Sequence, residues 1–250
     1  MPYILIFSHA SGCEFFVLKD NIKEIYDMNS ARKDEKVFST RTLAGIGVFA
    51  ALAYLTTLLC KLIPNVGGFL SVDAKDAVIA IASFIFGPIA APIISLIVAF
   101  IEFITISETG PWGLLMNFAA STAFSLTASL IYKYMKSFSG ALIAFGAATL
   151  VTTAVMVGLN PLVVPMYSGV SREVVIAMIP GLLLPFNFAK TLMNSALAML
   201  LYKPIINALR SAGLIKKNEH KATFNKTSVM TLVIGGLALA AAIVVLIVIG

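Results

Sequence analysis

Long runs without a charged residue alternate with short polar segments along most of the chain. An α-helix needs about 20 apolar residues to cross about 30 Å of hydrocarbon. The runs are long enough to hold or contribute such crossings, so the pattern predicts a protein built of membrane-spanning helices. The uncharged runs cover residues 42–60, 77–101, 109–132, 137–171, 174–189 and 227–250.

Proline positions subdivide two of these runs. The run 137–171 predicts a helix near 140–160 that ends at Asn160-Pro161, because the residue before proline disfavours helical backbone. The run 174–189 continues past Lys190 to about residue 206, which predicts a loop followed by a helix that begins at Pro185, a good first-turn residue.

The segment 77–106 is interrupted by Gly87-Pro88 and fits either one kinked helix or two. Basic residues before the first helix indicate a cytoplasmic N-terminus. The count of basic residues on each side of the membrane, leaving out Lys190 and the two lysines before Met28, differs between the two interpretations. If 77–106 is one span, 5 basic residues lie inside and 10 outside. If it is two spans, 12 lie inside and 3 outside. The excess of cytoplasmic basic residues in membrane proteins favours two spans. The expected helices are 41–62, 74–86, 88–106, 112–135, 140–160 and 185–208, plus a seventh at 228–249; the second is too short to cross squarely.

Composition supports an integral membrane protein. Of 250 residues, 59% are hydrophobic and 12% charged, against about 45–50% and about 25% in soluble proteins. This excludes a soluble enzyme, a nucleic-acid binder and a disordered chain. The net charge of +6 fits cationic cytoplasmic loops. Two cysteines and two histidines give no disulfide framework, metal site or cofactor site, and the chain lacks a phosphate-binding loop or an activated nucleophile. We therefore expect a non-enzyme, and any active transport must be powered by another subunit.

Polar residues inside the predicted spans are the candidates for function, because they are costly in lipid. In the sixth helix, Asn187, Lys190, Thr191 and Asn194 follow i, i+3, i+4, i+7 spacing and share one face. Interhelical hydrogen bonding, with Lys190 extending its ammonium to the membrane surface, is the alternative. Four polar groups on one face exceed what packing needs, so a binding role is favoured.

Other candidates have equally plausible structural roles. Asn117 lies in the fourth helix and Asn160 stands at a predicted helix end. Asp73 and Asp76 flank the start of the second helix, where Asp73 is well placed as an N-cap. Tyr167 falls near the predicted outer surface, where aromatic residues are common. Amides and one ammonium near the outer face suit an uncharged solute rich in hydroxyl and carbonyl groups.

Small residues form a stripe on the first helix. Ala44, Gly47 and Ala51 follow 3-then-4 spacing, which allows another helix to approach closely. Spacing alone does not decide whether that helix belongs to the same bundle or to a partner.

Two segments resemble the riboflavin-binding substrate-specificity (S) components of energy-coupling factor (ECF) transporters. They are Asn160-Pro-Leu-Val-Val-Pro-Met-Tyr-Ser-Gly169 and Leu184-Pro-Phe-Asn-Phe-Ala-Lys190. Supporting segments are Val72-Asp-Ala-Lys-Asp76, Phe86-Gly-Pro88 and Gly113-Leu-Leu-Met-Asn-Phe118. The resemblance spans about residues 40–210.

The resemblance implies an all-α membrane protein in which a six-helix bundle captures riboflavin from outside and passes it inward, with ATP hydrolysed by partners. It implies ligand contacts from Asn160, Asn187 and Lys190, a loop at Asp73–Asp76 that closes over the site, and a coupling subunit docked on Gly47 and Ala51. Asn117, Thr191 and Tyr167 are further candidate contacts, and Ala44 extends the docking stripe. The implied partners are that transmembrane coupling subunit, two ATPases, riboflavin and the lipid bilayer.

The chain departs from this pattern at both ends. We expect an N-terminal cytoplasmic extension at 1–40, of which 1–27 is hypothesised to lie upstream of the native start at Met28. The substrate-binding domain covers 41–210, a cationic linker 211–227, and an extra transmembrane helix 228–250 that is absent from the six-helix pattern. Alternatives are an S-component for another vitamin, or a non-transporting flavin-presenting or assembly protein in which the extra helix is the working part.

Overall fold

The computed structural model describes residues 39–135, 137–211 and 226–249. It divides the chain into two units, residues 1–43 and 44–250. Of the first unit, only 39–43 are described, and they contain the start of the first helix. The expected N-terminal extension, including the hypothesised upstream residues 1–27, lies outside the described residues apart from 39–40. Most of the expected linker also lies outside them.

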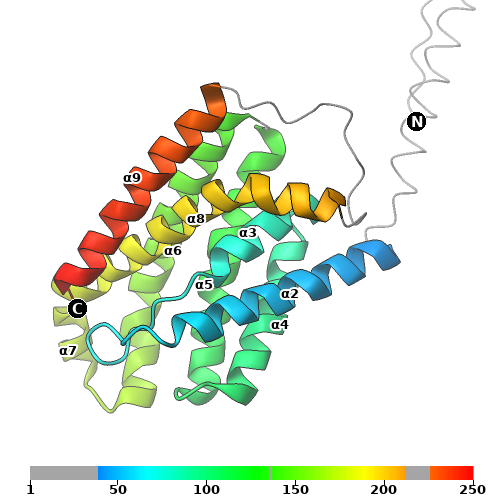
Figure 1. The fold of residues 1–250 in the computed structure, drawn as a ribbon. Coiled ribbons are helices and arrows are strands. Elements are labelled where there is room, and N and C mark those ends of the chain that lie inside the picture. Colours follow the sequence, from blue (N-terminus) through cyan, green and yellow to red (C-terminus); the bar gives the residue numbers. More distant parts are fainter. Residues whose placement is uncertain (1–38, 136, 212–225, 250) are drawn as a thin grey trace, which may run out of the picture. The chain divides into compact units, whose positions relative to one another are not determined.

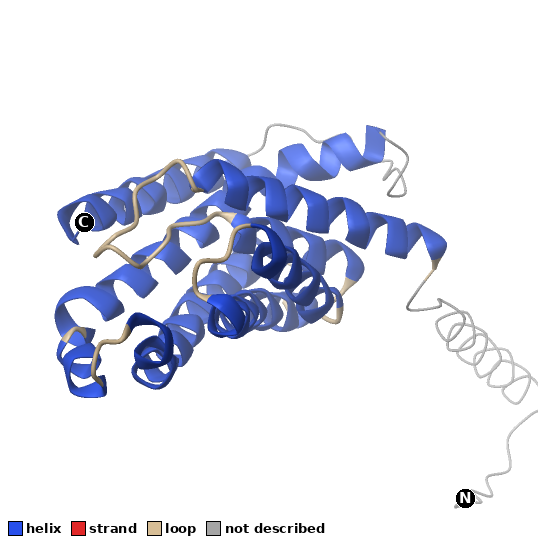
Figure 2. Cartoon of the chain, turned by 90° about the horizontal axis from the view of Figure 1, so that it is seen from below, coloured by secondary structure: helices blue, strands red, loops and turns tan. Residues whose placement is uncertain are grey.

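The described part of the chain is helical and contains no β-strand, as Figure 2 shows. The all-α prediction is confirmed. The elements are α2 (Thr40–Cys60), α3 (Lys75–Phe86), α4 (Ala90–Thr105), α5 (Gly110–Tyr134), α6 (Phe138–Ser168), α7 (Arg172–Ala177), the π-helix η1 (Ile179–Leu183), α8 (Leu184–Ser211) and α9 (Lys226–Ile249).

Four of the predicted membrane helices are supported by their length and composition. Four described helices are long and apolar enough to cross a bilayer: 42–60 of α2, all of α5, 139–168 of α6 and 229–249 of α9. The predicted break at Gly87-Pro88 is confirmed, because Gly87 has φ +98° and separates α3 from α4. With 12 residues, α3 is about 18 Å long and too short to span squarely, as expected.

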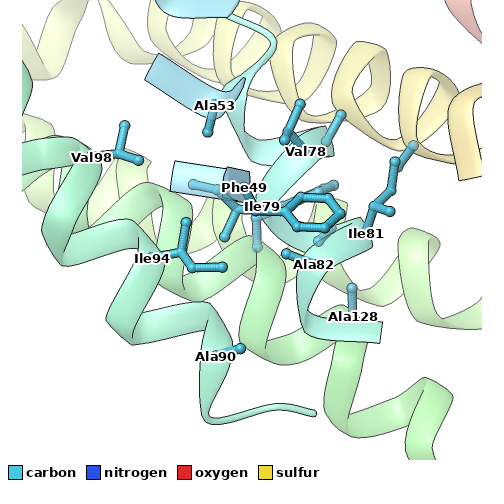
Figure 3. Packing of buried hydrophobic residues seen from close by; sticks show 14 of the residues in the cluster. Phe49, Ala53, Val78, Ile79, Ile81, Ala82, Ala90, Ile94, Val98 and Ala128 are labelled. Atoms are coloured by element: carbon cyan, nitrogen blue, oxygen red, sulfur yellow. The ribbon is translucent and has the colours of Figure 1, made fainter. Parts of the chain in front are cut away.

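The short helix α3 is the centre of the main hydrophobic core. Every residue from Lys75 to Ser83 is buried. A helix that is enclosed on all sides is apolar on every face rather than amphipathic. In agreement with this, residues 77–82 of α3 have the sequence Ala-Val-Ile-Ala-Ile-Ala. Figure 3 shows Ile79 and Ala82 of α3 among Phe49 of α2, Ile94 of α4 and Ala128 of α5.

The predicted end of the fifth helix at Asn160 is wrong. Helix α6 continues through Pro161 and Pro165 to Ser168, and ends at Gly169 with φ +71°. Proline removes one backbone donor but does not prevent a helix from continuing, and proline is tolerated where neighbouring helices surround it. The loop predicted before Pro185 is also wrong, because α7 and η1 occupy most of it and α8 begins at Leu184.

The additional helix α9 packs along α8 (Figure 1). A Cβ placed on Gly235 would lie 3.0 Å from the Cδ2 of Leu200 and 3.6 Å from the carbonyl oxygen of Ala196. Glycine therefore permits this close approach. Further along, Ala242 and Leu246 join a second hydrophobic cluster with Ala189 and Met193 of α8.

The loop of residues 61–74 joins α2 to α3 and packs against that second cluster. Val66 and Leu70 exchange two backbone hydrogen bonds of 2.8 and 3.0 Å around a tight turn. Gly67 and Gly68 both have positive φ, a conformation that glycine adopts without strain. Val66, Leu70 and Val72 are buried, so this loop is anchored at one end of the bundle, called the loop end below.

Candidate ligand-binding site

An ion pair links the loop end of α8 to loop 61–74. The ammonium of Lys190 lies 2.8 Å from Oδ2 of Asp73 and donates a longer bond, 3.4 Å, to the carbonyl oxygen of Ser71. Burial raises the pKa of the Asp73 carboxyl, but the ammonium groups of Lys190 and Lys75 outweigh burial and hold the pKa below its usual value. The carboxylate is therefore ionised at neutral pH.

Two alternatives considered for these residues are wrong. Asp73 does not cap α3, because Ala74 occupies the N-cap position and no side chain caps it. Lys190 does not extend its ammonium to the membrane surface, since its side chain is 14% exposed and is paired with Asp73.

Asn194 fixes the start of α3 from another helix. Its Oδ1 accepts a 2.9 Å hydrogen bond from the backbone N–H of Ala77, one of the first-turn donors that lack a partner within a helix. Its Nδ2 donates to the carbonyl oxygens of Asp73 at 2.9 Å and of Lys190 at 3.1 Å. The amide is completely buried and has partners on both sides. Asn194 therefore positions the loop, and its amide is already engaged by protein.

A second buried ion pair, Lys75 with Glu102, lies next to Asp73. Lys75 donates to both carboxylate oxygens of Glu102 at 2.8 and 2.7 Å, and its Nζ is 3.7 Å from Oδ2 of Asp73. Thr57 of α2 and Asn117 of α5 also donate to Glu102, at 3.0 and 2.8 Å. Four hydrogen bonds from three side chains thus compensate one buried carboxylate, and the contacts join α2, α3, α4 and α5.

Sequence reasoning missed Glu102. A carboxylate inside a predicted span is a usable signal, but this residue stands where the uncharged run ends and therefore looks like a boundary. Asn117, a candidate ligand contact, is engaged with Glu102. Asp76 lies in α3 rather than in a closing loop, is buried, and accepts a short hydrogen bond from Ser121 of α5.

The other candidates lie on α6 and α8. Nδ2 of Asn187 donates to the carbonyl oxygen of Leu183 at 2.7 Å, and Thr191 donates to the carbonyl oxygen of Asn187 at 2.8 Å. Asn160 is 2% exposed, and its Nδ2 has no hydrogen-bond partner among the described residues. Tyr167 is half-buried against the second hydrophobic cluster. A buried amide with a free donor is costly unless a ligand or water pairs with it.

The π-helix η1 immediately precedes this part of α8. Backbone carbonyls in π-turns are displaced from the α-helical register, and such turns are frequent at functional sites. Leu183, the last residue of η1, is the residue whose carbonyl accepts from Asn187. The side-chain amide of Asn187 is therefore hydrogen-bonded to a backbone carbonyl of the π-helix.

A polar cavity of about 80 Å³ opens at the loop end. Asp73, Lys75, Glu102 and Asn117 line it together with hydroxyl groups from loop 61–74 and the α4–α5 connection. Oδ1 of Asp73 has no hydrogen-bond partner in the described part of the chain. One oxygen of a carboxylate in the cavity wall is therefore a buried acceptor without a partner among the described residues.

The small-residue stripe on α2 faces away from the bundle. Ala44, Gly47 and Ala51 are exposed, and a Cβ placed on Gly47 would meet nothing within 4 Å. By contrast, a Cβ on Gly45 would come within 2.3 Å of Cζ of Phe86, so Gly45 is the glycine that α2 uses for close packing on α3.

Comparison with known proteins gives concordant matches. The model of the family described as "ECF transporter, substrate-specific component" matches residues 41–202, which is more than half of the chain. The chain is 30% identical over 190 residues to the riboflavin transporter RibU of Staphylococcus aureus (strain TCH60), covering 73% of this chain and 99% of that protein. It is 26% identical over 184 residues to the riboflavin transporter FmnP of Bacillus subtilis (strain 168), covering 69% of this chain and 97% of that protein.

A solved structure has the same fold. It is described as the S component of a bacterial ECF transporter, and it is similar to this chain with a TM-score of 0.59 and 30% identity. The match covers 68% of this chain and 98% of that chain. The family match ends at residue 202, so α9 lies beyond it.

Proposed function

The chain belongs to the family of ECF transporter substrate-specific components, and we propose that it binds riboflavin at the outer face of the cell membrane for uptake. The family is one of transport proteins, so this multi-pass membrane protein is a substrate-binding subunit and not an enzyme. Riboflavin is the transported ligand. The names of the two riboflavin-transporting relatives support the choice of this vitamin.

The observation that carries the proposal is the ion pair between Lys190 of α8 and the buried Asp73 of loop 61–74, supported by buried amides on α8 and α6. Lys190 is held by Asp73 at 2.8 Å, Asn187 lies on the adjacent turn of α8, and Asn160 presents a free amide donor from α6. Amide and ammonium donors match the carbonyl and imide groups of a flavin ring. Thr191, Tyr167, Asn117 and Asp76 complete the proposed set of contacts. If the N-terminus is cytoplasmic, as the basic residues before α2 suggest, α2 crosses the membrane once and its far end, at loop 61–74, lies on the outer side.

We propose that the exposed stripe Ala44, Gly47 and Ala51 on α2 docks a transmembrane coupling subunit, which carries two ATPases. An exposed small-residue stripe in a membrane lets a second helix approach closely, and nothing in the described bundle covers Gly47. Energy for transport then comes from those partners.

Uptake of labelled riboflavin tests this function in a riboflavin auxotroph that supplies the coupling and ATPase subunits. Uptake should depend on this chain and be competed by riboflavin but not by pantothenate or thiamine precursors. Asn187→Leu should abolish uptake by weakening binding severely. Gly47→Leu should abolish uptake while leaving binding intact, and Gly146→Leu, another exposed glycine with open space around it, is the control. If a different vitamin competes for uptake and riboflavin does not, that vitamin is the ligand and the choice of riboflavin is wrong.

A second candidate function rests on α9, which lies outside the family match and packs along α8. A non-transporting subunit that presents flavin to another membrane protein would use α9 as its contact. Riboflavin binding without uptake, and without association with coupling subunits, would favour this function.

A further inference from the structure

An apolar groove lies on the membrane-facing side of α6, α8 and α9. Helices α6 and α9 both pack against α8 (Figure 1), and a groove of about 330 Å³ is lined by all three. Two of its large side chains, Leu150 of α6 and Phe188 of α8, are exposed. Helix α9 contributes Ile234 and Ala238, which lie beyond the family match that ends at residue 202. The groove is therefore open to lipid and is completed by the helix that lies outside the family match.

The wall of the groove offers little to a polar ligand. Its two hydroxyl groups, from Thr149 of α6 and Ser195 of α8, are buried and hydrogen-bonded to each other at 3.0 Å. No charged residue is found among the described residues that line it. A sugar, a vitamin or a free phosphate placed here would lose hydrogen bonds to water without replacing them. The wall therefore favours a hydrocarbon occupant.

The groove reaches toward the end of the bundle that is opposite the loop end. Leu142, one of its lining residues, lies four residues after the start of α6 at Phe138, which is about 6 Å along the helix axis. Ile234 lies eight residues after the start of α9 at Lys226, which is about 12 Å. A chain that enters from this end can therefore run along the groove toward the middle of the membrane.

The same end of these helices is basic by sequence. Helix α8 continues past Met199, its last residue in the groove wall, to Lys203 and Arg210. Helix α9 begins at Lys226, and α6, α8 and α9 contain no aspartate or glutamate. If the N-terminus is cytoplasmic, this end lies at the inner leaflet, where basic residues attract anionic headgroups. The charge therefore complements an anionic lipid rather than a neutral one.

We propose that the groove binds one acyl chain of an anionic phospholipid from the inner leaflet, with the phosphate at the basic ends of α8 and α9. The acyl chain fills the space that the packing of α6 and α9 on α8 leaves open. A lipid that binds only the folded protein stabilises it by mass action. The lipid site is separate from the proposed flavin site, because none of the proposed riboflavin contacts lines the groove.

Phosphatidylglycerol and phosphatidylcholine with identical acyl chains test the proposal on the purified full chain in detergent. Native mass spectrometry counts the lipids that remain bound, and thermal unfolding measures their effect on stability. One phosphatidylglycerol per chain should be retained in preference to phosphatidylcholine by roughly fivefold, the scale of one basic residue near an anionic headgroup. The same lipid should raise the unfolding temperature, and added salt should reduce the preference.

Two pairs of variants locate the lipid on the chain. Ala238→Trp fills the groove from α9 and should abolish both retention and the rise in unfolding temperature, whereas Ala240→Trp, at an exposed position of α9 outside the groove wall, should keep both. Leu150→Asn, at an exposed position, places an amide against the acyl chain without disturbing the core and should weaken retention by about tenfold. Ile143→Asn, also exposed on α6 but outside the wall, is its control.

The proposal is overturned if Ala238→Trp and Leu150→Asn retain phosphatidylglycerol as well as their controls do. Equal retention of the two lipids by the unmodified chain would overturn the choice of an anionic lipid. If Ala238→Trp loses association with a second copy or with a coupling subunit while lipid retention is unchanged, the groove docks a protein and the proposal is wrong.

Discussion

Helix α8 takes part in two regions that are stabilised in different ways. At the loop end its Lys190 and Asn194 contact charged and polar partners in loop 61–74 and α3, and Lys190 is paired with the buried Asp73. Along its contact with α9, the partners are small and apolar, and Gly235 lets the two backbones approach. The first region is costly to build in a membrane, whereas the second needs only close packing.

The contrast indicates where function lies. Charges that are buried in pairs contribute little net stability compared with apolar residues of the same volume. Their presence at the loop end therefore points to a role in recognition, and the free donor of Asn160 and free acceptor of Asp73 agree with that. The described part of the α8–α9 contact is built around Gly235 and the apolar residues Ala242 and Leu246, and no ion pair is seen in it.

The largest effect is expected from breaking the second ion pair. Glu102→Leu leaves Lys75 buried without its main counter-charge, which should lower the free energy of unfolding by about 3–5 kcal/mol. Removing both charges with Lys75→Met and Glu102→Leu should restore much of the loss. Thermal unfolding in detergent measures both variants. A double variant as unstable as the single one would show that the pair itself, rather than the unpaired charge, sustains the fold.

A somewhat smaller effect is expected at the first ion pair. Lys190→Met removes the ammonium that Asp73 holds in place, and riboflavin affinity should fall roughly 100-fold, the scale of losing hydrogen bonds to a charged group. Fluorescence titration measures it. Lys133→Met, on the exposed surface at the other end of α5, is the matched control. If Lys190→Met and Lys133→Met bind riboflavin with equal affinity, Lys190 is not part of the binding site.

The smallest effect is expected in the apolar region. Gly235→Leu forces α9 away from α8 and should cost about 1–3 kcal/mol of stability through overpacking. Gly236→Leu places the same side chain where a Cβ meets nothing within 4 Å and should cost nothing. Riboflavin affinity should change little in either variant. A large loss of affinity in Gly235→Leu alone would mean that α9 belongs to the binding machinery.

Sequence reasoning located most helices well, because uncharged hydrophobic runs mark the segments that suit a membrane and the distribution of basic residues favoured two helices over one at 77–106. It separated α3 from α4 at Gly87-Pro88 and recognised α3 as short. It ended α6 too early, since a local preference against helix before Pro161 is overridden when the surrounding helices hold the backbone. It missed α7 and η1 because short helical turns without an apolar period leave no pattern.

The site was predicted in part. The polar face of α8 was visible from spacing, but the pairing of Lys190 with Asp73 joins residues 117 positions apart and has no local signal. The same holds for Glu102, whose partners come from three other helices. The exposure of Gly47, and the use of Gly45 for packing, follow from how α2 is rotated against α3, which spacing alone leaves open.

Titration of the purified full chain with riboflavin tests the central claim most directly. The account predicts that flavin fluorescence is quenched to saturation at one riboflavin per chain, and that Lys190→Met and Asn187→Leu strongly reduce this quenching while remaining folded. Folded protein that leaves riboflavin fluorescence unchanged would contradict the claim that the polar groups at the loop end form a flavin site.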